Sequence, residues 1–398
     1  MKRKTRAVWW MALALLVIST TAWGIACGTQ GDIIGGVTSW PYSGVKPWAK
    51  IDLDPDQGGL QPFIFISNGD FDYIEPSLVK AHGYFWVFFE RRFWRMVDGI
   101  KVPTGSDILV GRSTDTLTYE WVNDGKPVLR ADQHWETGCV GAPTVRAKGD
   151  GFEMWYAGGV GAGIGFATSD DGIAWTKHDG PVVTGDQNWE DGFVGAPAVV
   201  RFAGRFRMYY SGGFARQTEF SQFAGRFIGY ADSENGVTWT KRDAHGRNSK
   251  DDPGDVFYIL GPTQPWQGYD PQDPYAGAVA SPSPLFTRPV DRNLLLLYYT
   301  GNPVGDPVNS ETSVGVAGAY DEMIDIEDGA EFEVNPVLSE RFALTLDGVS
   351  QYLAYSESTP SVIRTEFDQY FMAFSQTDPL SELTGGKQGI AMAACPRY

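Results

Sequence analysis

The chain has 398 residues, a length typical of two or three average domains or of one large β architecture. Its 49 acidic residues outnumber its 32 basic ones, and the formal net charge of −17 argues against nucleic-acid binding, which requires a basic surface. Hydrophobic residues make up 42% and charged residues 20%, which is inconsistent with global disorder, and 48 glycines with 14% aromatic residues favour turn-rich β structure.

The N-terminal segment has the pattern of an export signal. A basic start precedes an apolar stretch, residues 7–18, which is too short for a transmembrane helix and suits a signal peptide. Ala26-Cys27 then resembles the bacterial lipoprotein signal, in which the cysteine is lipidated and becomes the first residue of the mature chain. A plain secretory signal, with Cys27 incidental, is the alternative. We predict a signal peptide over 1–26 and a tether over 27–40, hence an exported protein anchored by lipid to the bacterial cell envelope, facing the periplasm or the surface.

Two segments of the chain repeat each other. Trp135 to Gly158 and Trp189 to Gly212 share a Trp-Glu pair, a Val-Gly-Ala-Pro segment and a methionine followed by two aromatic residues. Each copy continues with an Ile-Gly-x-Ala segment that ends in an Asp-Gly or Asn-Gly turn, which favours a tight hairpin. Each repeat therefore predicts four short antiparallel strands, the pattern of a propeller blade.

Weaker copies flank these two, beginning at Glu75-Pro76 upstream and at Pro282 and Pro360 downstream. We therefore predict an all-β, five-bladed β-propeller with four-stranded antiparallel blades over residues 41–398. The fifth copy ends after its third strand, so we expect a strand within residues 32–68 to complete it and close the ring, which removes open sheet edges. Residues 243–278 predict an insertion over one face, since they are too long for a hairpin loop.

This repeat resembles the five-bladed propeller glycosidases, the arabinanase-, xylosidase- and invertase-like families that include glycoside hydrolase families 43 and 32. In those families the site lies at the mouth of the central channel, where a base, an acid and a pKa-tuning aspartate stand at the start of inner strands. Two carboxylates must flank the anomeric carbon. The usual positions are Asp-Pro in the first two blades and Glu-x-Pro in the third.

The chain departs from this pattern at two of the three positions. Glu75 precedes Pro76 in the base position, but Ala142 precedes Pro143 and Gly195 stands two residues before Pro197. Any hydrolytic activity must therefore use other carboxylates. We predict Glu75, Asp72 and Glu357 as catalytic residues.

Further residues are candidates for sugar binding, because carboxylates bind hydroxyls, guanidinium groups bind acidic sugars, and aromatic rings stack on sugar faces. The plain alternatives are solvated carboxylates, salt bridges and, for the two glutamates that recur after a repeated tryptophan, hydrogen bonds that support a loop. Trp94 and Trp266 are expected in loops, where a ring can stack on a sugar face. The candidates are Asp70, Glu90, Arg91, Trp94, Glu136 and Glu190.

The sequence predicts no cofactor and no zinc site, although the acidic loops 250–255 and 270–273 could hold a structural calcium ion. Cys139 and Cys395 could form a disulfide, or both could be free thiols. We expect a monomer that binds carbohydrate, contacts the membrane through Cys27 and binds no nucleic acid. Two function classes remain: a glycosidase-like enzyme, and a non-catalytic propeller lipoprotein that binds a glycan or a protein.

Overall fold

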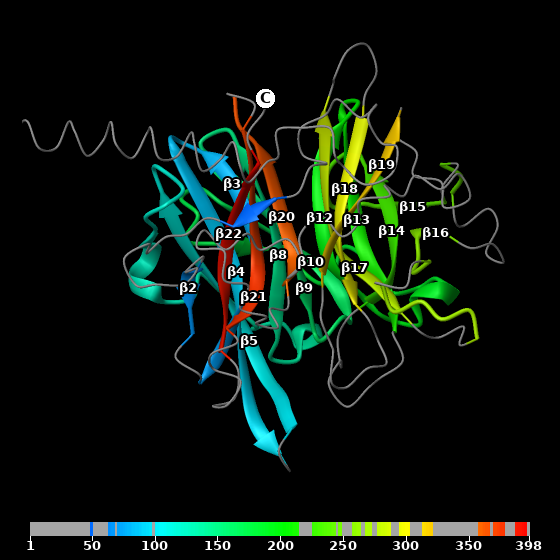
Figure 1. Cartoon of the computed structure of the whole chain (residues 1–398), viewed down its shortest axis with the longest axis horizontal. Helices are drawn as coiled ribbons and strands as arrows, with labels where there is room; N and C mark the ends of the chain where they lie inside the picture. Colours follow the sequence, from blue (N-terminus) through cyan, green and yellow to red (C-terminus); the bar gives the residue numbers. More distant parts are fainter. Residues whose placement is uncertain are drawn as a thin grey trace, which may run out of the picture.

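The computed structural model describes residues 48–50, 63–67, 70–97, 100–214, 225–243, 246–248, 257–263, 267–272, 277–287, 294–302, 313–320, 357–366, 369–378 and 387–395. These residues form five antiparallel sheets arranged as a five-bladed β-propeller (Figure 1), which confirms the predicted fold. No helix in these ranges is long and apolar enough to cross a membrane. The signal peptide, the tether and Cys27 lie outside the described residues.

The first three blades follow the two repeats and the copy before them. Blade 1 contains β3 (Phe71–Ala81), β4 (Tyr84–Val97), β5 (Ile100–Ser113), β6 (Glu120–Trp121) and β7 (Leu129–Arg130). Blade 2 contains β8 (Val140–Lys148), β9 (Gly151–Gly158), β10 (Gly163–Ser169) and β11 (Thr176–Lys177). Blade 3 contains β12 (Val194–Phe202), β13 (Arg205–Phe214), β14 (Gly225–Ser233), β15 (Thr240–Arg242) and β16 (Tyr258–Leu260).

The last two blades complete the ring, and short 3-10 helices lie in the connections before and after β7 and before β12. Blade 4 contains β17 (Ala278–Thr287), β18 (Leu294–Asn302) and β19 (Ser313–Tyr320). Blade 5 contains β20 (Glu357–Arg364), β21 (Tyr370–Asp378) and β22 (Lys387–Cys395), joined by β1 (Ala49–Lys50) and β2 (Phe63–Ile66). The 3-10 helices are η2 (Val122–Gly125), η3 (His134–Glu136) and η4 (Asn188–Glu190).

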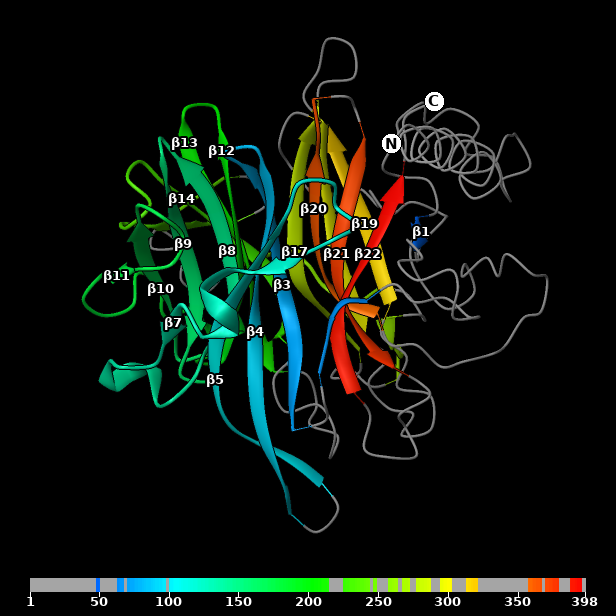
Figure 2. The same ribbon diagram turned by 90° about the vertical axis from the view of Figure 1, so that its left-hand side faces the viewer.

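The N-terminal part of the chain closes the ring, as the missing outer strand of blade 5 predicts. Both β1 and β2 pair antiparallel with β22, the last strand of the chain, for example through Phe63 and Ala391. Figure 2 shows β1 beside β22 at the edge of this blade. Cys139 is a free thiol, so of the two alternatives for the cysteines its disulfide with Cys395 is not formed.

The prediction for the insertion needs a correction. In blade 3 both β15 and β16 pair with β14, so the outer strand is formed in two pieces, and the second piece, β16, lies within the predicted insertion. Blade 1 has the same arrangement, since β6 and β7 both pair with β5. The insertion therefore interrupts an outer strand, and its residues 258–260 lie at the edge of a blade.

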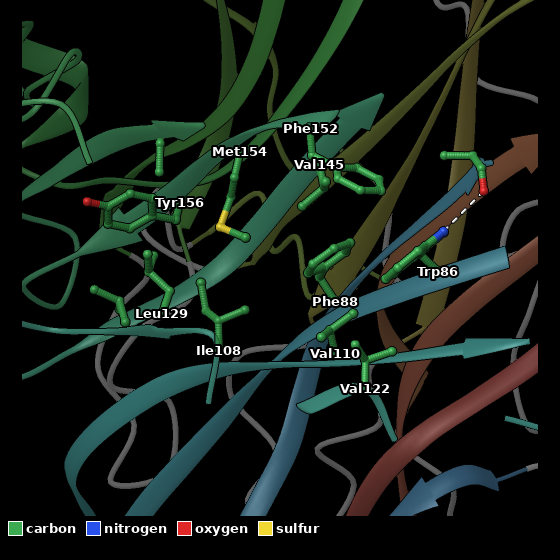
Figure 3. Packing of buried hydrophobic residues seen from close by; sticks show 13 residues of the cluster. Trp86, Phe88, Ile108, Val110, Val122, Leu129, Val145, Phe152, Met154 and Tyr156 are labelled. Atoms are coloured by element: carbon green, nitrogen blue, oxygen red, sulfur yellow. Dashed lines mark hydrogen bonds between the residues drawn. The ribbon is translucent and has the colours of Figure 1, made fainter. Parts of the chain in front are cut away.

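The hydrophobic core lies between neighbouring blades. Five buried clusters fill the five interfaces between blades. Successive side chains of a strand point to opposite faces of the sheet, so one strand contributes to the interfaces on both sides of its blade. In β4, Trp86 and Phe88 face blade 2, where they meet Phe152 (Figure 3), whereas Val87 and Phe89 face blade 5. Because every blade is apolar on both faces, polar side chains are concentrated along the axis and in the connecting loops.

Candidate functional site at the channel axis

The axis of the propeller is surrounded by five X-Pro pairs, one from each inner strand. Every inner strand shifts register at this point, so that X and the proline form a β-bulge. Each X residue adopts a left-handed φ between 42° and 54°. Because the two alanines adopt it as well, this conformation is set by the repeat and not by the side chain at X. The five X residues are Glu75, Ala142, Ala196, Ser281 and Thr359.

These five pairs surround a small cavity at the axis. Its volume is about 30 Å³, which is enough for one or two water molecules. Of the five X positions, one carries a carboxylate, Glu75, and the other four carry alanine, serine or threonine. A single ionisable side chain therefore lies at the centre of a ring whose backbone is the same in all blades.

Hydrogen bonds between blades hold this ring in place. The N–H of Glu75 donates to Ser375 Oγ at 2.9 Å, that of Ser281 to Ser211 Oγ at 2.9 Å, and that of Thr359 to Thr300 Oγ1 at 2.7 Å. Each acceptor stands at the same position of the second strand in the preceding blade. A second series of hydrogen bonds between blades uses the serine or threonine that follows the proline, so the Pro-Ser and Pro-Thr pairs are its signal in the sequence. Ser77 Oγ, for instance, accepts from the N–H of Val145 at 2.9 Å.

Blade 1 departs from this pattern by placing a carboxylate, Glu90, where blades 3, 4 and 5 have a hydroxyl and blade 2 has Ala157. Glu90 Oε2 accepts from the N–H of Ala142 at 3.2 Å, and Glu90 Oε1 accepts from Arg92 Nε at 2.7 Å. Glu90 is 4% exposed. Its carboxylate occupies space that a side chain at Gly141 would need, because a Cβ there would lie 1.8 Å from Glu90 Oε2.

The carboxyl of Glu75 is electrostatically perturbed by this neighbourhood. Burial, followed by the negative charge of Glu90, raises the pKa of Glu75 from 4.5 to about 7. Arg92 and a hydrogen bond with the Ser281 side chain act in the opposite direction. Burial acts to lower the pKa of Arg92, but the charges of Glu90, Glu75 and Asp72 outweigh it and raise this pKa, because one guanidinium lies among three carboxyl groups.

The structure places the three predicted catalytic residues at the same end of the channel. Asp72 lies in β3, three residues before Glu75, and is 8% exposed. Glu357 begins β20 in the adjacent blade 5, where its backbone pairs with Gln376; its side chain lies outside the described residues. Blades 1 and 5 therefore supply all three residues, and the axis carries Glu75.

The predicted sugar-binding residues of blade 1 have varied surroundings. Asp70 is exposed in the bend before β3. Arg91 donates to both oxygens of Asp107, at 3.0 and 2.7 Å, the salt bridge given as its alternative. Trp94 was expected in a loop, and this is wrong: β4 continues through it and pairs it with Pro103, in a hairpin that extends beyond the other strands (Figures 1 and 2).

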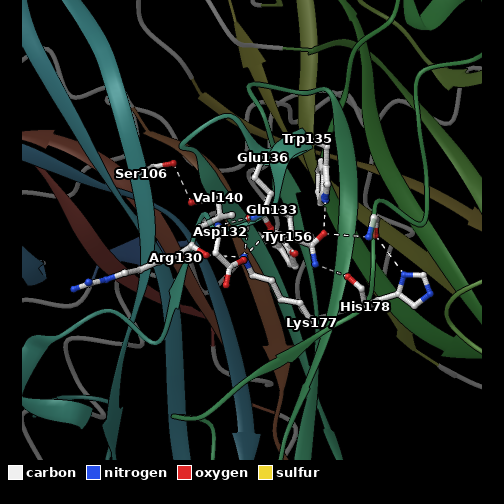
Figure 4. Close-up of polar contacts among 11 residues, drawn as sticks. Ser106, Arg130, Asp132, Gln133, Trp135, Glu136, Val140, Tyr156, Lys177 and His178 are labelled. Carbon is white, nitrogen blue, oxygen red and sulfur yellow. Dashed lines mark hydrogen bonds and ion pairs between the residues drawn. The ribbon is translucent and has the colours of Figure 1, made fainter.

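Glu136 and Glu190 have no exposed surface. Glu136 accepts from Lys177 Nζ at 2.7 and 2.8 Å, from the Tyr156 hydroxyl at 2.8 Å, and from two backbone N–H groups of its loop (Figure 4). Glu190 repeats this arrangement with Lys241 and Tyr210. These contacts support the loop, which is the alternative given for the two glutamates in the sequence analysis. The carboxylate oxygens are buried and hydrogen-bonded, so they are not accessible to a sugar.

Some of the other predicted residues lie outside the described part of the chain. Trp266, the loop 250–255 and Asp273 are among the residues that are not described, and Asp270 is exposed. Within the described ranges, no group of three or more His, Cys, Asp or Glu side chains could hold a metal ion. The charged group that the structure brings together is Asp72, Glu75, Glu90 and Arg92.

No protein-family model and no curated protein matches the sequence. Solved structures do match. A glycosyl hydrolase from Bacteroides ovatus has a TM-score of 0.54 and 14% identity over 89% of this chain and 94% of that one. A structure from the GH130 family, whose title describes hydrolases that target β-1,2 mannosidic linkages in Candida mannan, has a TM-score of 0.55 and 15% identity over 89% and 94%. The chain shares their fold.

A thermostable family-43 glycoside hydrolase matches in the same way, with a TM-score of 0.51 and 15% identity over 81% of this chain and 89% of that one. The likeness thus extends over nearly the whole propeller in each case. At 14 or 15% sequence identity, these matches show that the proteins share a fold. The chemistry of this chain has to be argued from its own side chains.

Proposed function

We propose that this chain is a carbohydrate-active protein that hydrolyses a glycosidic bond at the channel mouth formed by blades 1 and 5. The observation that carries the proposal is Glu75, a carboxyl on the propeller axis with its pKa raised to about 7. At neutral pH such a group is present in both protonation states, so it can donate a proton to a leaving oxygen or accept one from water. The shared fold with glycoside hydrolases supports the same interpretation.

Hydrolysis requires a second carboxyl group on the other side of the sugar ring. We propose Asp72, with Glu357 from the adjacent blade as the alternative partner. The Arg92 guanidinium compensates part of the negative charge of these carboxyl groups. A 2.7 Å hydrogen bond from Arg92 to Glu90 fixes the orientation of the guanidinium. Two carboxyl groups in different surroundings are the combination that acid and base roles need, and the raised pKa of Glu75 favours it as the acid.

One observation favours the second function class, a propeller that binds a glycan or a protein without turnover. The resembled families place further catalytic carboxylates directly before the proline of blade 2 and two residues before the proline of blade 3, and this chain has Ala142 and Gly195 there. A single tuned carboxyl can serve recognition as well as catalysis. Turnover therefore decides between the two classes.

The test is a release assay with the purified full chain on plant and bacterial polysaccharides and on aryl glycosides. We expect Glu75→Gln to reduce turnover by about 10²- to 10⁴-fold, the usual contribution of general acid–base catalysis. Asp72→Asn should give a second loss. Glu120→Gln is the control, because Glu120 is an exposed carboxylate on the outer strand of the same blade.

Turnover that survives Glu75→Gln unchanged would overturn the assignment. Saturable glycan binding without release of product, in both the natural chain and the variant, would establish the binding class. The proposal includes export and a lipid anchor on Cys27, which rest on the N-terminal sequence. Fractionation of cells that produce the chain or its Cys27→Ser variant tests the anchor, which predicts that the variant leaves the membrane fraction.

A further inference from the structure

A second cavity lies on the other side of the X-Pro ring. It has a volume of about 490 Å³ and is enclosed by the five inner strands, each of which contributes the segment that begins at its proline. This volume is within the range of small-molecule sites. The walls are β-strands with a proline in every blade, so the cavity exists without rearrangement of the backbone. The segments are residues 76–80, 143–147, 197–201, 282–286 and 360–364.

The cavity is basic in an acidic protein. Four of its five wall segments contribute a cation, namely Lys80, Arg146, Arg201 and Arg364, and no Asp or Glu is among the described residues that line it. The chain as a whole has a net charge of −17. A concave surface of one sign, enclosed by protein, concentrates ions of the opposite sign.

The repeat places these cations at the same depth. Lys80, Arg201 and Arg364 each stand four residues after the proline of their blade, and Arg146 stands three residues after its own. The corresponding residue of blade 4 is Phe286. The cations therefore belong to one level of the channel, at the end opposite to Glu75.

Neighbouring carboxylates compensate this charge incompletely. Lys80 pairs with Glu366 at 2.6 Å, but the Glu366 side chain is 59% exposed, and Arg146 pairs with Glu153 at 3.3 Å. Arg201 donates to the carbonyl oxygen of Gly204 at 2.8 Å, a partner without net charge. Burial lowers the pKa of Arg146; the charge of Glu153 acts against this, and the positive charge of Arg201 lowers the pKa further, as expected where two guanidinium groups share one region.

We propose that this cavity is a binding site for the oxyanion of an acidic small molecule, either the carboxylate of a sugar acid or a phosphate ester. Arginine binds such groups through paired N–H donors, and several cations from different blades can contact one anion. Phe286, stacked on Phe202 with ring centroids 4.2 Å apart, adds an apolar wall against which a sugar ring can pack. The site is separate from the proposed catalytic one.

The test is isothermal titration calorimetry of the full chain with sodium phosphate and, separately, with sodium galacturonate, in chloride buffer at constant ionic strength. We expect saturable binding of at least one probe, weakened by about tenfold in Arg201→Gln and in Arg364→Gln, the loss of one charge-assisted contact. Arg205→Gln is the matched control, because Arg205 is also exposed in the β12–β13 hairpin but does not line the cavity.

The two probes distinguish the sources of the oxyanion: binding of phosphate alone indicates a phosphate ester, and binding of galacturonate alone indicates a sugar acid. Glu75→Gln should leave this binding unchanged, so a failure of the catalytic proposal does not affect the result. The proposal is overturned if neither probe binds saturably, or if Arg205→Gln weakens binding as much as Arg201→Gln and Arg364→Gln do.

Discussion

The carboxylates of blade 1 and of the loop that leads into blade 2 differ in how fully their charge is compensated. Glu136, in that loop, has a lysine, a tyrosine hydroxyl and two backbone N–H groups around it. In blade 1, Glu75 and Glu90 share Arg92 with Asp72, and the pKa of Glu75 rises to about 7. A fully bonded carboxylate stabilises the fold, whereas an undercompensated one marks a candidate functional site.

The largest expected effect on stability comes from removing the compensated carboxylate. Glu136→Ala leaves the Lys177 ammonium, which is 8% exposed, without its buried counterion. We expect the free energy of unfolding to fall by about 3 to 5 kcal/mol, measured by urea denaturation. Glu120→Ala, which breaks an exposed pair with Arg112, should cost less than about 1 kcal/mol. Equal losses in the two variants would contradict the distinction.

The undercompensated carboxyl predicts a pH dependence. Because the pKa of Glu75 is raised from 4.5 to about 7, the folded chain holds this proton more tightly than the unfolded chain. The stability that this contributes is present below pH 4.5 and is lost as the pH rises through 7. The Glu75→Gln variant has no carboxyl group to titrate at this position. Its free energy of unfolding, relative to that of the natural chain, should therefore rise by up to about 3 kcal/mol across this pH window.

Unfolding of both chains in urea at several pH values between 4 and 8 measures this difference. Since Glu75 is partly exposed, solvent screening makes the full value an upper bound. A constant difference between the two chains at all pH values would show that Glu75 titrates normally and would remove the main support for its catalytic role.

The smallest expected effect concerns one repeat position in two blades. A Cβ on Gly141 would lie 1.8 Å from Glu90 Oε2, whereas a Cβ on Gly195, the equivalent residue of blade 3, would meet Phe193 Cζ at 3.2 Å. Gly141→Ala should therefore displace Glu90 and cost about 1 to 3 kcal/mol, and Gly195→Ala less. Thermal unfolding compares them; a greater loss in Gly195→Ala would refute the explanation.

The sequence predicted the blades because each strand has a local signature. The aromatic pairs, the Asp-Gly and Asn-Gly turns and the X-Pro pairs depend on neighbours in sequence, and the two clear repeats identify the weaker copies. The closing strand followed from the incomplete fifth copy. The end of β4 did not follow, because the residues after Phe89 are charged and aromatic without a turn signal until residue 98, and the strand continues to Val97.

The site could be predicted only in part. Glu75 was found from its position before Pro76, but its environment depends on Glu90, Arg92 and Ser281, and Ser281 is contributed by blade 4. The roles of Glu136 and Glu190 were equally hidden, because each one meets its lysine through the folding of a blade. Side chains that are distant in sequence determine which of the many acidic residues is undercompensated.

Ring closure has a consequence for the order in which the protein matures. The backbone N–H of Glu75 donates to Ser375, a residue 300 positions later, in the blade that β2 completes. At about 5 to 20 residues per second, a ribosome needs about 15 to 60 seconds to make that stretch. During this time the apolar strand Phe63–Ile66 has no partner from β22. The hydrogen bond that holds the central carboxylate therefore cannot form before Ser375 has been made, and the candidate site is completed only after the strands of the first four blades.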